Sequence, residues 1–417
     1  MSFLNKSIFF TGFVFILLNL NSCRQWKTPD NEPNSRLLEL KKEISEDLTG
    51  NLLPYWAATM PDTINGGFYG RVDANEQVYP DAEKGGILNA RILWTFSSAY
   101  RVLKDSTYLH LATYAKDYIV KHFLDEKYGG AYRTVTMKGE PGDTRKHTLT
   151  ESYFIYAFAE YYRATGDQEA LNIAIEIFEL LEKHALDKDL NGYFEVFTRN
   201  WERSHDLLIG ENSLEDEKTM ITHLHLVEAY AGLYRVWPEK RMEEILRNIL
   251  HVFKDKIVDK ETFHLIYFLD RNWNATTQID SYGHDIEATW LLYEAAEVLN
   301  NCELMKRSRK RAVVMAQRVL DEAMADDGGI VYESDGEGNL TDPDSHWWAQ
   351  AEAVVGFFNA YQLSGNKQFL NAAERCWKFI EKYISDHTNG GWFYKVTPER
   401  KVVETEYKIS EWKGPYH

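Results

Sequence analysis

Five side chains spaced along this chain have the types and intervals that proton-transfer chemistry needs. His284 and Glu287 lie three residues apart, and His225 and Glu228 repeat the same His-x-x-Glu spacing upstream. Residues i and i+3 share one face of a helix, so each imidazole and its carboxylate point at a common volume. His417 is the last residue of the chain. Because imidazoles titrate near neutral pH, these residues are candidates for general acid–base catalysis.

The neighbouring histidines His223 and His225 cannot serve the same site. They are two residues apart, which separates them by about 200° around a helix. A helical metal site requires i,i+4 spacing, so this pair does not predict a metal centre. We therefore expect one of the two to be functional and the other structural.

Three further residues are candidates for holding a ligand. Arg91 lies among apolar residues, where a buried guanidinium requires acceptors, either in a ligand or in a structural salt bridge. Trp347 lies near the start of a predicted helix, and Trp412 lies in the C-terminal stretch that ends at His417. Most Trp side chains fill cores, but a Trp beside a polar mouth also offers a flat face to the C–H surface of a sugar ring and an N–H donor.

The elements that must position these residues form a sixfold repeat. Two helical patterns and a short Gly-aromatic segment recur, the segments lying at 65–71, 128–133, 191–197, 263–268, 327–333 and 389–394. Equivalent positions in successive segments, from Gly67 to Gly391, are 62 to 72 residues apart. A nearly fixed period indicates a repeat architecture, and six helix pairs without long linkers favour a closed ring. The predicted fold is an all-α (α/α)6 barrel with short β-hairpin links.

The helices that follow the segments are expected to form the inner ring of the barrel. They are predicted at 86–102, 146–162, 217–234, 282–299 and 345–363, and they are rich in Ala, Trp and Tyr. Inner helices of such a barrel run parallel, so residues near their N-termini meet at one mouth. Arg91, His225, His284, Glu287 and Trp347 all lie in the first halves of these helices, which predicts one cleft.

Composition narrows the class of ligand. The formal net charge is −17, and Lys and Arg are not concentrated in any stretch, which argues against a nucleic-acid groove. Phosphate-binding loops and nucleophile elbows are not found in the sequence, so nothing points to a nucleotide cofactor. We expect a small neutral ligand, no cofactor, no metal and no nucleic acid.

The N-terminus indicates export. Residues 1–22 have a charged start and a short apolar stretch typical of a signal peptide rather than of an uncleaved anchor helix. Cys23 ends a lipobox-like sequence, which predicts lipidation and attachment to a bacterial cell envelope, facing the periplasm or the surface. Residues 23–35 suit a polar tether, and residues 36–417 form the barrel domain. Cys302 and Cys376 are expected to be buried thiols.

Five motifs together resemble the N-acylglucosamine 2-epimerase superfamily, most closely its cellobiose and mannobiose 2-epimerase branch. They lie at residues 85–94 (GGILNARILW), 222–230 (THLHLVEAY), 281–290 (SYGHDIEATW), 347–353 (WWAQAEA) and 412–417 (WKGPYH). The resemblance implies metal-free epimerisation at C2 of the reducing-end sugar of a β-1,4-linked disaccharide, through a cis-enediol. It also implies the (α/α)6 barrel that the repeats predict.

The resemblance assigns a role to each matching residue. His284 and His417 would be the acid/base pair at C2, and His225 would assist ring opening or stabilise the enediol. The residues implied to contact the sugar are Arg91, which would polarise its oxygens, Glu287, which would hold His284 or the substrate, and Glu333, Trp347 and Trp412, which would grip the rings. Histidines that titrate near the working pH suit both proton transfers.

The chain departs from the family pattern at three places. Relatives usually carry Tyr at the position of Leu149 and Asn at that of Ile221, both near the substrate. They also continue past the Pro-Tyr-His motif, so the last inner helix, expected to start at about Ser410, is predicted to be truncated at His417. These departures leave the identity of the disaccharide open.

Three other functions remain open from the sequence. An aldose–ketose isomerase would use the same enediol and return the proton to C1. A glycoside hydrolase would use a carboxylate pair drawn from Asp285, Glu287 and Glu333. A degenerate, non-catalytic sugar-binding lipoprotein is the third alternative.

Overall fold

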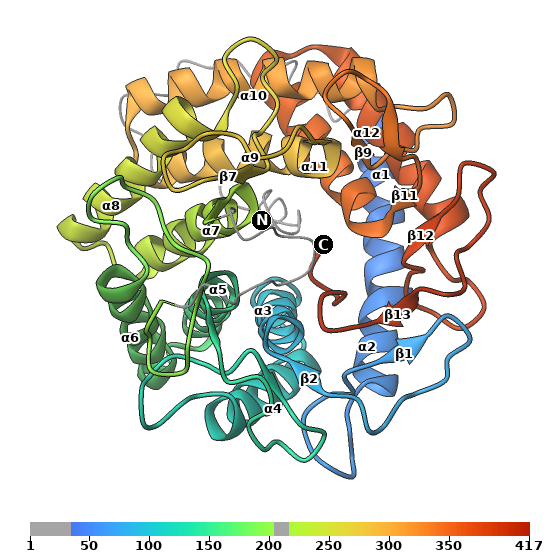
Figure 1. The fold of residues 1–417 in the computed structure, drawn as a ribbon. Coiled ribbons are helices and arrows are strands. Elements are labelled where there is room, and N and C mark those ends of the chain that lie inside the picture. Colours follow the sequence, from blue (N-terminus) through green and yellow to red (C-terminus); the bar gives the residue numbers. More distant parts are fainter. Residues whose placement is uncertain (1–34, 204–216) are drawn as a thin grey trace, which may run out of the picture.

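The computed structural model describes residues 35–203 and 217–417, which form two concentric rings of helices (Figure 1). The outer helices are α1 (Ser35–Asp47) continued by η1 (Leu48–Leu52) and α2 (Leu53–Thr59), α4 (Ser106–His122), α6 (Gln168–His184), α8 (Lys240–Val252) with η2 (Phe253–Ile257), α10 (Cys302–Glu322), and α12 (Lys367–Phe379) with η3 (Ile380–Ile384). The inner helices are α3 (Gly86–Leu103), α5 (Thr148–Thr165), α7 (Met220–Val236), α9 (Tyr282–Val298) and α11 (Trp347–Ser364). The predicted (α/α)6 architecture and the alternation of outer and inner helices are confirmed.

The two rings differ in burial because they differ in sequence. Almost every residue in the first three turns of each inner helix is buried, whereas the outer helices bury one face. Four outer helices begin at an Asp or Asn whose side chain accepts a hydrogen bond from an amide of the first turn, namely Asp105, Asp167, Asn301 and Asn366. These caps fix the start of the four outer helices. The inner helices are stabilised by their burial between neighbouring elements.

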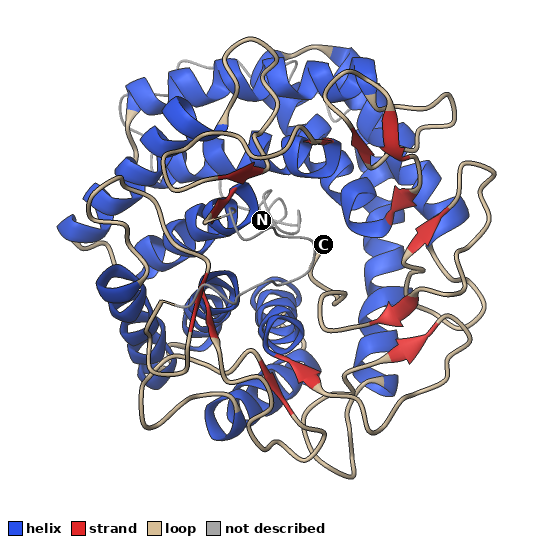
Figure 2. Cartoon of the chain, in the orientation of Figure 1, coloured by secondary structure: helices blue, strands red, loops and turns tan. Residues whose placement is uncertain are grey.

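Short antiparallel sheets lie at one end of the barrel (Figure 2). The paired strands are β2 (Lys84–Gly85) with β3 (Thr134–Val135), β4 (Lys146–His147) with β5 (Val196–Phe197), β6 (Lys218–Thr219) with β7 (Phe268–Leu269), β8 (Asp280–Ser281) with β9 (Glu333–Ser334) and β10 (Leu340–Asp342), β11 (Ser345–His346) with β12 (Lys395–Val396), and β1 (Val72–Asp73) with β13 (Tyr407–Ile409). Each sheet joins two successive links, and β1 with β13 joins the first link to the last.

The predicted Gly-aromatic strands were placed too early. Most of their residues form turns that are closed by isolated β-bridges, such as the one between Leu124 and Ala131. The β-strands start only near the end of each segment or after it. The cause is a tight turn in which Gly67, Gly130, Gly192 and Gly391 all have φ between +66° and +78°. Left-handed backbone favours glycine and interrupts a strand.

A buried ion pair recurs at this turn and fixes the links to the inner helices. Lys84, Lys146, Lys218 and Lys408 each place Nζ 2.7–3.2 Å from the carboxylate of Asp62, Asp125, Asp187 and Asp386 respectively. Each carboxylate also accepts from amides of its own turn. Each aspartate therefore connects its turn to the neighbouring strand, so these four links share the same local structure.

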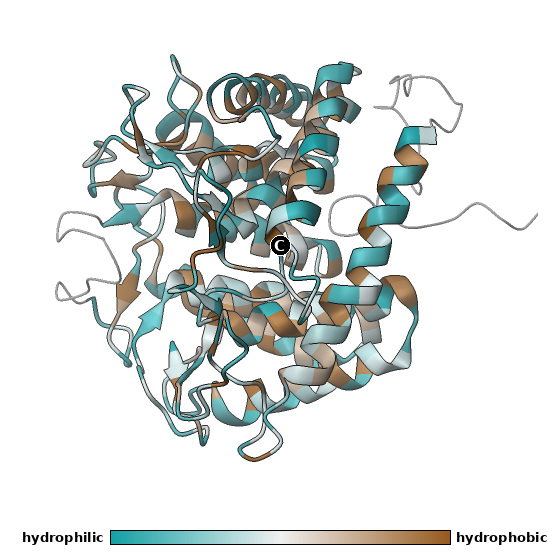
Figure 3. Ribbon diagram, turned by 90° about the vertical axis from the view of Figure 1, so that its right-hand side faces the viewer, coloured by the Kyte–Doolittle hydropathy of each residue, from teal (hydrophilic) through white to brown (hydrophobic). Residues whose placement is uncertain are grey.

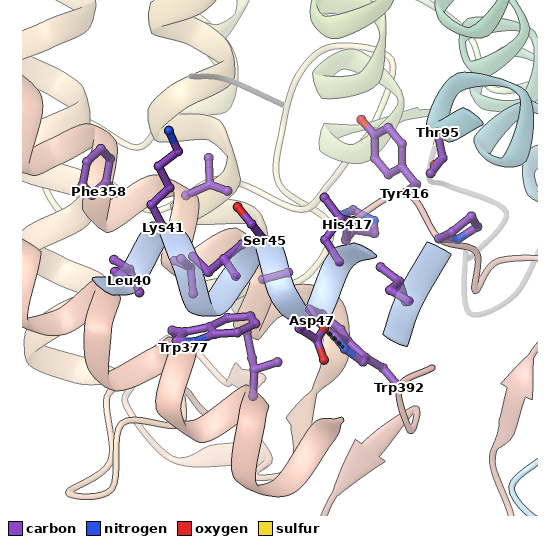
Figure 4. Close-up of a pocket in the computed structure, with 18 of the residues that line it drawn as sticks. Leu40, Lys41, Ser45, Asp47, Thr95, Phe358, Trp377, Trp392, Tyr416 and His417 are labelled. Carbon is purple, nitrogen blue, oxygen red and sulfur yellow. Dashed lines mark hydrogen bonds between the residues drawn. The ribbon is translucent and has the colours of Figure 1, made fainter. Parts of the chain in front are cut away.

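The inner ring has no helix between α11 and α3 in the described part of the chain. Residues 410–417, where the last inner helix was expected to start, run without regular structure toward the barrel axis (Figure 1). A cavity of about 170 Å³ occupies the sixth inner position, between α1, α3, α11 and the Tyr416–His417 segment, with Trp94, Val354 and Phe358 among its apolar walls (Figure 4). Figure 3 shows α1 at the edge of the molecule. As expected from the sequence, residues 410–417 form no inner helix.

The predictions for the signal peptide, Cys23 and the tether fall on residues 1–34 or include them, and these lie outside the described residues. None of the described helices is long and apolar enough to cross a membrane. Cys376 is a buried free thiol, as expected. Cys302 is exposed in the first turn of α10 and is disulfide-bonded, so the prediction that it is a buried thiol was wrong on both counts. The first turn of α10 lies at the surface, where the side chain has no apolar core to pack against.

Candidate active site

The candidate site lies at the barrel axis, where the inner helices present the same register position. The sixth residues of α3, α5, α7, α9 and α11 are Arg91, Tyr153, His225, Glu287 and Glu352. All five are buried. The repeat therefore places one polar side chain per inner helix at the same level, and the five form a ring that residues 412–417 complete.

One continuous hydrogen-bond chain links three of the helices to the C-terminal segment. Arg91 donates from Nη2 to the Tyr153 hydroxyl at 2.5 Å, and that hydroxyl lies 3.0 Å from Nε2 of His225. Nδ1 of His225 lies 3.1 Å from Oε2 of Glu228, whose other oxygen accepts from the Tyr416 hydroxyl. Both ring nitrogens of His225 are therefore engaged. The predicted pairing of His225 with Glu228 is present.

His223 faces away from this ring, as its position on α7 requires. Its Nδ1 lies 2.7 Å from the carbonyl oxygen of Thr219, and its Nε2 accepts from the amide of Tyr193 at 3.0 Å. The side chain is fully buried. His223 thus joins α7 to the preceding link, which is a structural role.

His284 is held by a serine and not by the glutamate three residues later. Its Nδ1 lies 2.7 Å from Oγ of Ser281, the residue that precedes α9, and its ring centre lies 4.6 Å from that of Trp348. Glu287 points instead toward Glu352 and His417. The implied contact between Glu287 and His284 is absent among the described residues, and Nε2 of His284 is left without a hydrogen bond there.

His417 has the same arrangement with a different partner. Its Nδ1 lies 2.8 Å from Oε1 of Glu352, and Oε2 of that carboxylate accepts from Nε1 of Trp290 at 2.7 Å. The side chain is only 4% exposed, and its ring centre lies 5.7 Å from that of Trp348. Trp348 therefore contacts both His284 and His417. Each of these two imidazoles uses Nδ1 for a fixed partner, which leaves Nε2 for a ligand.

Burial sets the protonation of the site. It lowers the pKa of His284 to about 3 and holds the pKa values of His225 and His417 well below 6.5, with Arg91 adding to both of the latter shifts. Burial likewise raises the pKa of Glu352 to about 7, although Trp290 and Arg91 oppose it. The imidazoles are therefore neutral at neutral pH, which is the form required of a base.

The remaining predicted ligand-binding residues lie around this ring. Trp347 opens α11, is 4% exposed, and has a buried Nε1 without a hydrogen-bond partner. Trp412 is half-buried, and its carbonyl oxygen accepts from Arg91, so the contact with the guanidinium is made by its backbone. Glu333 lies in β9 opposite Ser281, beside the start of α9. The structure thus brings the predicted residues to one end of the barrel axis.

The two departures from the family pattern occupy equivalent positions. Leu149 and Ile221 are the second residues of α5 and α7, four residues before Tyr153 and His225. Leu149 is buried and Ile221 half-buried. Each therefore places an aliphatic side chain one turn above a polar residue of the ring.

One group of atoms could hold a cation. An oxygen from each of Glu287 and Glu352 and a ring nitrogen of His417 all lie within 4.8 Å of one another. Nδ1 of His417 already contacts Glu352.

Four residues of the site were absent from the prediction, namely Tyr153, Ser281, Glu352 and Tyr416. Aligning the repeats on the first residue of each inner helix would have found Tyr153 and Glu352, because they share the register position of Arg91 and His225. Ser281 and Tyr416 belong to motifs quoted for the resemblance, but their contacts depend on backbone geometry that spacing does not reveal.

Comparison with known proteins agrees with this geometry. The model of the N-acylglucosamine 2-epimerase (GlcNAc 2-epimerase) family matches residues 67–417. The chain belongs to the N-acylglucosamine 2-epimerase family. Members of this family are carbohydrate epimerases, so the chain is an isomerase, as the motifs implied.

Several relatives and solved structures are cellobiose 2-epimerases. A cellobiose 2-epimerase of Bacteroides fragilis is 42% identical over 378 residues, which cover 91% of this chain and 96% of that protein. A cellobiose 2-epimerase of Ruminococcus albus is 39% identical over 90% of this chain and 95% of its own length. The solved cellobiose 2-epimerase of Bacillus thermoamylovorans has a TM-score of 0.87 at 37% identity, covering 91% of this chain and 97% of that one. A D-mannose isomerase structure, at 18% identity and a TM-score of 0.79, shares the fold.

Proposed function

We propose that this family member epimerises C2 of the reducing-end sugar in a β-1,4-linked disaccharide, cellobiose or mannobiose. The observation that carries the proposal is the pair His284 and His417, two neutral imidazoles that both contact Trp348 and each leave Nε2 without a hydrogen bond among the described residues. The relatives named cellobiose 2-epimerases support the choice of substrate class. Trp347 and Trp412 supply the flat faces that a disaccharide requires.

The proposed reaction needs one base and one acid on opposite faces of C2. Opening of the hemiacetal exposes an aldehyde that acidifies the C2–H bond. One imidazole removes this proton to give a cis-enediol, and after rotation about C2–C3 the other imidazole returns a proton to the opposite face. Arg91 stabilises the negative charge that develops on oxygen.

His225 has a different role in this scheme. Its Nε2 is occupied by Tyr153 and its Nδ1 by Glu228, so it has no free nitrogen to accept the C2 proton. Through Tyr153 it joins the chain that begins at Arg91, which suits stabilisation of the enediol oxygens rather than proton transfer at carbon.

The test is incubation of the enzyme with cellobiose, and separately with β-1,4-mannobiose, in D2O, followed by NMR. We expect deuterium at C2 of the inverted aldose. A ketose product would indicate an aldose–ketose isomerase, release of monosaccharide would indicate a hydrolase, and absence of exchange with both sugars would contradict the proposal. Among the hydrolase candidates, Asp285 is buried and bonded to His264 at 2.7 Å, which removes it from the cleft.

We further propose that Cys23 is lipidated and holds the enzyme at a bacterial cell envelope. The support for this location is the sequence of residues 1–35, in which an apolar stretch, a lipobox-like cysteine and a polar tether follow one another.

A further inference from the structure

Glu287 is the least satisfied charged group of the site. It is 1% exposed, and its Oε1 is buried without a hydrogen-bond partner. Its helix position points it into the ring, where one of its oxygens lies within 4.8 Å of Glu352 and of His417. A buried ionised carboxylate without donors is costly, and such a group holds a proton instead.

The groups that face Glu287 reinforce this conclusion. Glu352 on α11 and Glu228 on α7 are both buried carboxyl groups, while His284, His225 and His417 are neutral. Arg91 is the cation of the ring, but it donates to the Trp412 carbonyl and the Tyr153 hydroxyl, both uncharged. Like charges in one site cannot all ionise.

The proton of the pair belongs on Glu287 and not on Glu352. Glu352 accepts hydrogen bonds from Trp290 at 2.7 Å and from His417 at 2.8 Å, and donors of this kind stabilise the ionised form. Burial, with the neighbouring Glu352 and Glu228, raises the pKa of Glu287 well above 4.5. An environment of this kind can keep a carboxylic acid neutral at pH 7.

We propose that Glu287 is a neutral carboxylic acid at neutral pH and donates a hydrogen bond to an oxygen of the reducing-end sugar. The identity of the acceptor rests on the proposed function, whereas the protonation state does not. Glu287 and Glu352 then have opposite roles. Glu287 acts on the sugar as a donor, and Glu352, whose pKa burial raises only to about 7, is the more readily ionised of the two and accepts from His417.

The protonation state is measured by infrared difference spectroscopy of the intact protein at pH 7. Wild type minus Glu287→Gln should show the carbonyl band of a protonated carboxylic acid, which shifts in D2O. Glu352→Gln is the matched comparison: because it removes the neighbouring carboxyl group, it should lower the pH at which the Glu287 band disappears, while the band remains present at lower pH. If wild type minus Glu287→Gln lacks the band at pH 7, Glu287 is ionised and the proposal fails.

The donor role is measured by C2 exchange. The amide of Glu287→Gln still donates, so it should retain exchange within about tenfold of wild type. Glu287→Ala should lose roughly 10²–10³-fold, the usual cost of removing a donor from a developing charge. Equal losses in both variants would overturn the donor role. A wild type that shows the infrared band but no exchange would refute the proposed function and leave the protonation intact.

A metal would be the competing explanation for clustered carboxylates. Titration of the purified enzyme with Zn²⁺ or Mn²⁺ alone should show no stoichiometric site that depends on Glu287. Tight binding that Glu287→Ala abolishes would mean that the pair is a ligand set, and the proposal would be wrong.

Discussion

Replacement of His284 by Asn tests the acid/base pair most directly. Asn is short and keeps a polar group near Oγ of Ser281, which lies 2.7 Å from Nδ1 of His284, but it has no nitrogen that can accept a proton. General acid–base groups contribute roughly 10²–10⁴-fold, which corresponds to about 3–5 kcal/mol of activation free energy. C2 exchange with cellobiose in D2O, followed by NMR, should fall by that factor.

The cost to folding should be small by comparison. Among the described residues His284 makes one hydrogen bond, which Asn can retain, and it packs against Trp348 with ring centres 4.6 Å apart. Loss of such an aromatic contact costs about 0.5–1.5 kcal/mol. Urea unfolding should therefore show a slightly lower midpoint with an unchanged slope.

His223→Asn is the matched control, because His223 is equally buried but lies outside the cleft. It loses hydrogen bonds to Thr219 and Tyr193, which should cost about 1–3 kcal/mol of stability per unsatisfied group, while turnover of the folded protein stays near that of wild type. If His284→Asn keeps more than about a tenth of wild-type exchange, or if the two variants show the reverse pattern, the assignment of the base is mistaken.

Three shorter predictions concern stability and location. Lys84→Met should lower the free energy of unfolding by about 3–5 kcal/mol, because it leaves the buried carboxylate of Asp62 unpaired. Lys146→Met should lower it by less, because Arg199 still pairs with Asp125. Urea unfolding measures both changes. Asp342 has its pKa lowered to about 2 by His346 and the Asp344 amide, against the effect of burial. Since the folded value lies below 3.8, the stability advantage of wild type over Asp342→Asn should be present above pH 3.8 and disappear as the pH falls toward 2. Cys23→Ser should move the enzyme from the membrane to the soluble or unprocessed fraction, and unchanged fractionation would contradict lipidation.

The helices could be predicted because the same sequence pattern recurs in each repeat. Inner helices such as α9 begin within a few residues of the predicted bounds, since each follows a glycine-containing link and carries a long apolar pattern. The strands could not, because the paired segments are only two or three residues long and are set by Lys–Asp pairs that join residues 20 or more apart. Short-range patterns do not contain such contacts.

The sequence predicted which residues gather at the site better than it predicted the contacts between them. The i,i+3 rule found the bond between His225 and Glu228 because both lie within α7. It failed for His284, which lies in the first turn of α9, where its Nδ1 reaches Ser281 just before the helix. Contacts between separate helices, such as Glu352 with His417, depend on the closure of the barrel, which no local spacing reports.

The sheet that joins β1 to β13 places the first and last links of the barrel side by side, and this has a consequence for the order in which the fold can form. Asp47 accepts a hydrogen bond from Trp392, and Asn51 from the amide of Gly391, across 345 and 340 residues. At 5–20 residues per second, the first outer helix waits roughly 20–70 s for these partners. Each later outer helix packs against the inner helix made just before it, so it meets its partner as soon as it emerges. The first outer helix is therefore the last to meet its partners, and its apolar face stays uncovered until residues 391–392 have been made.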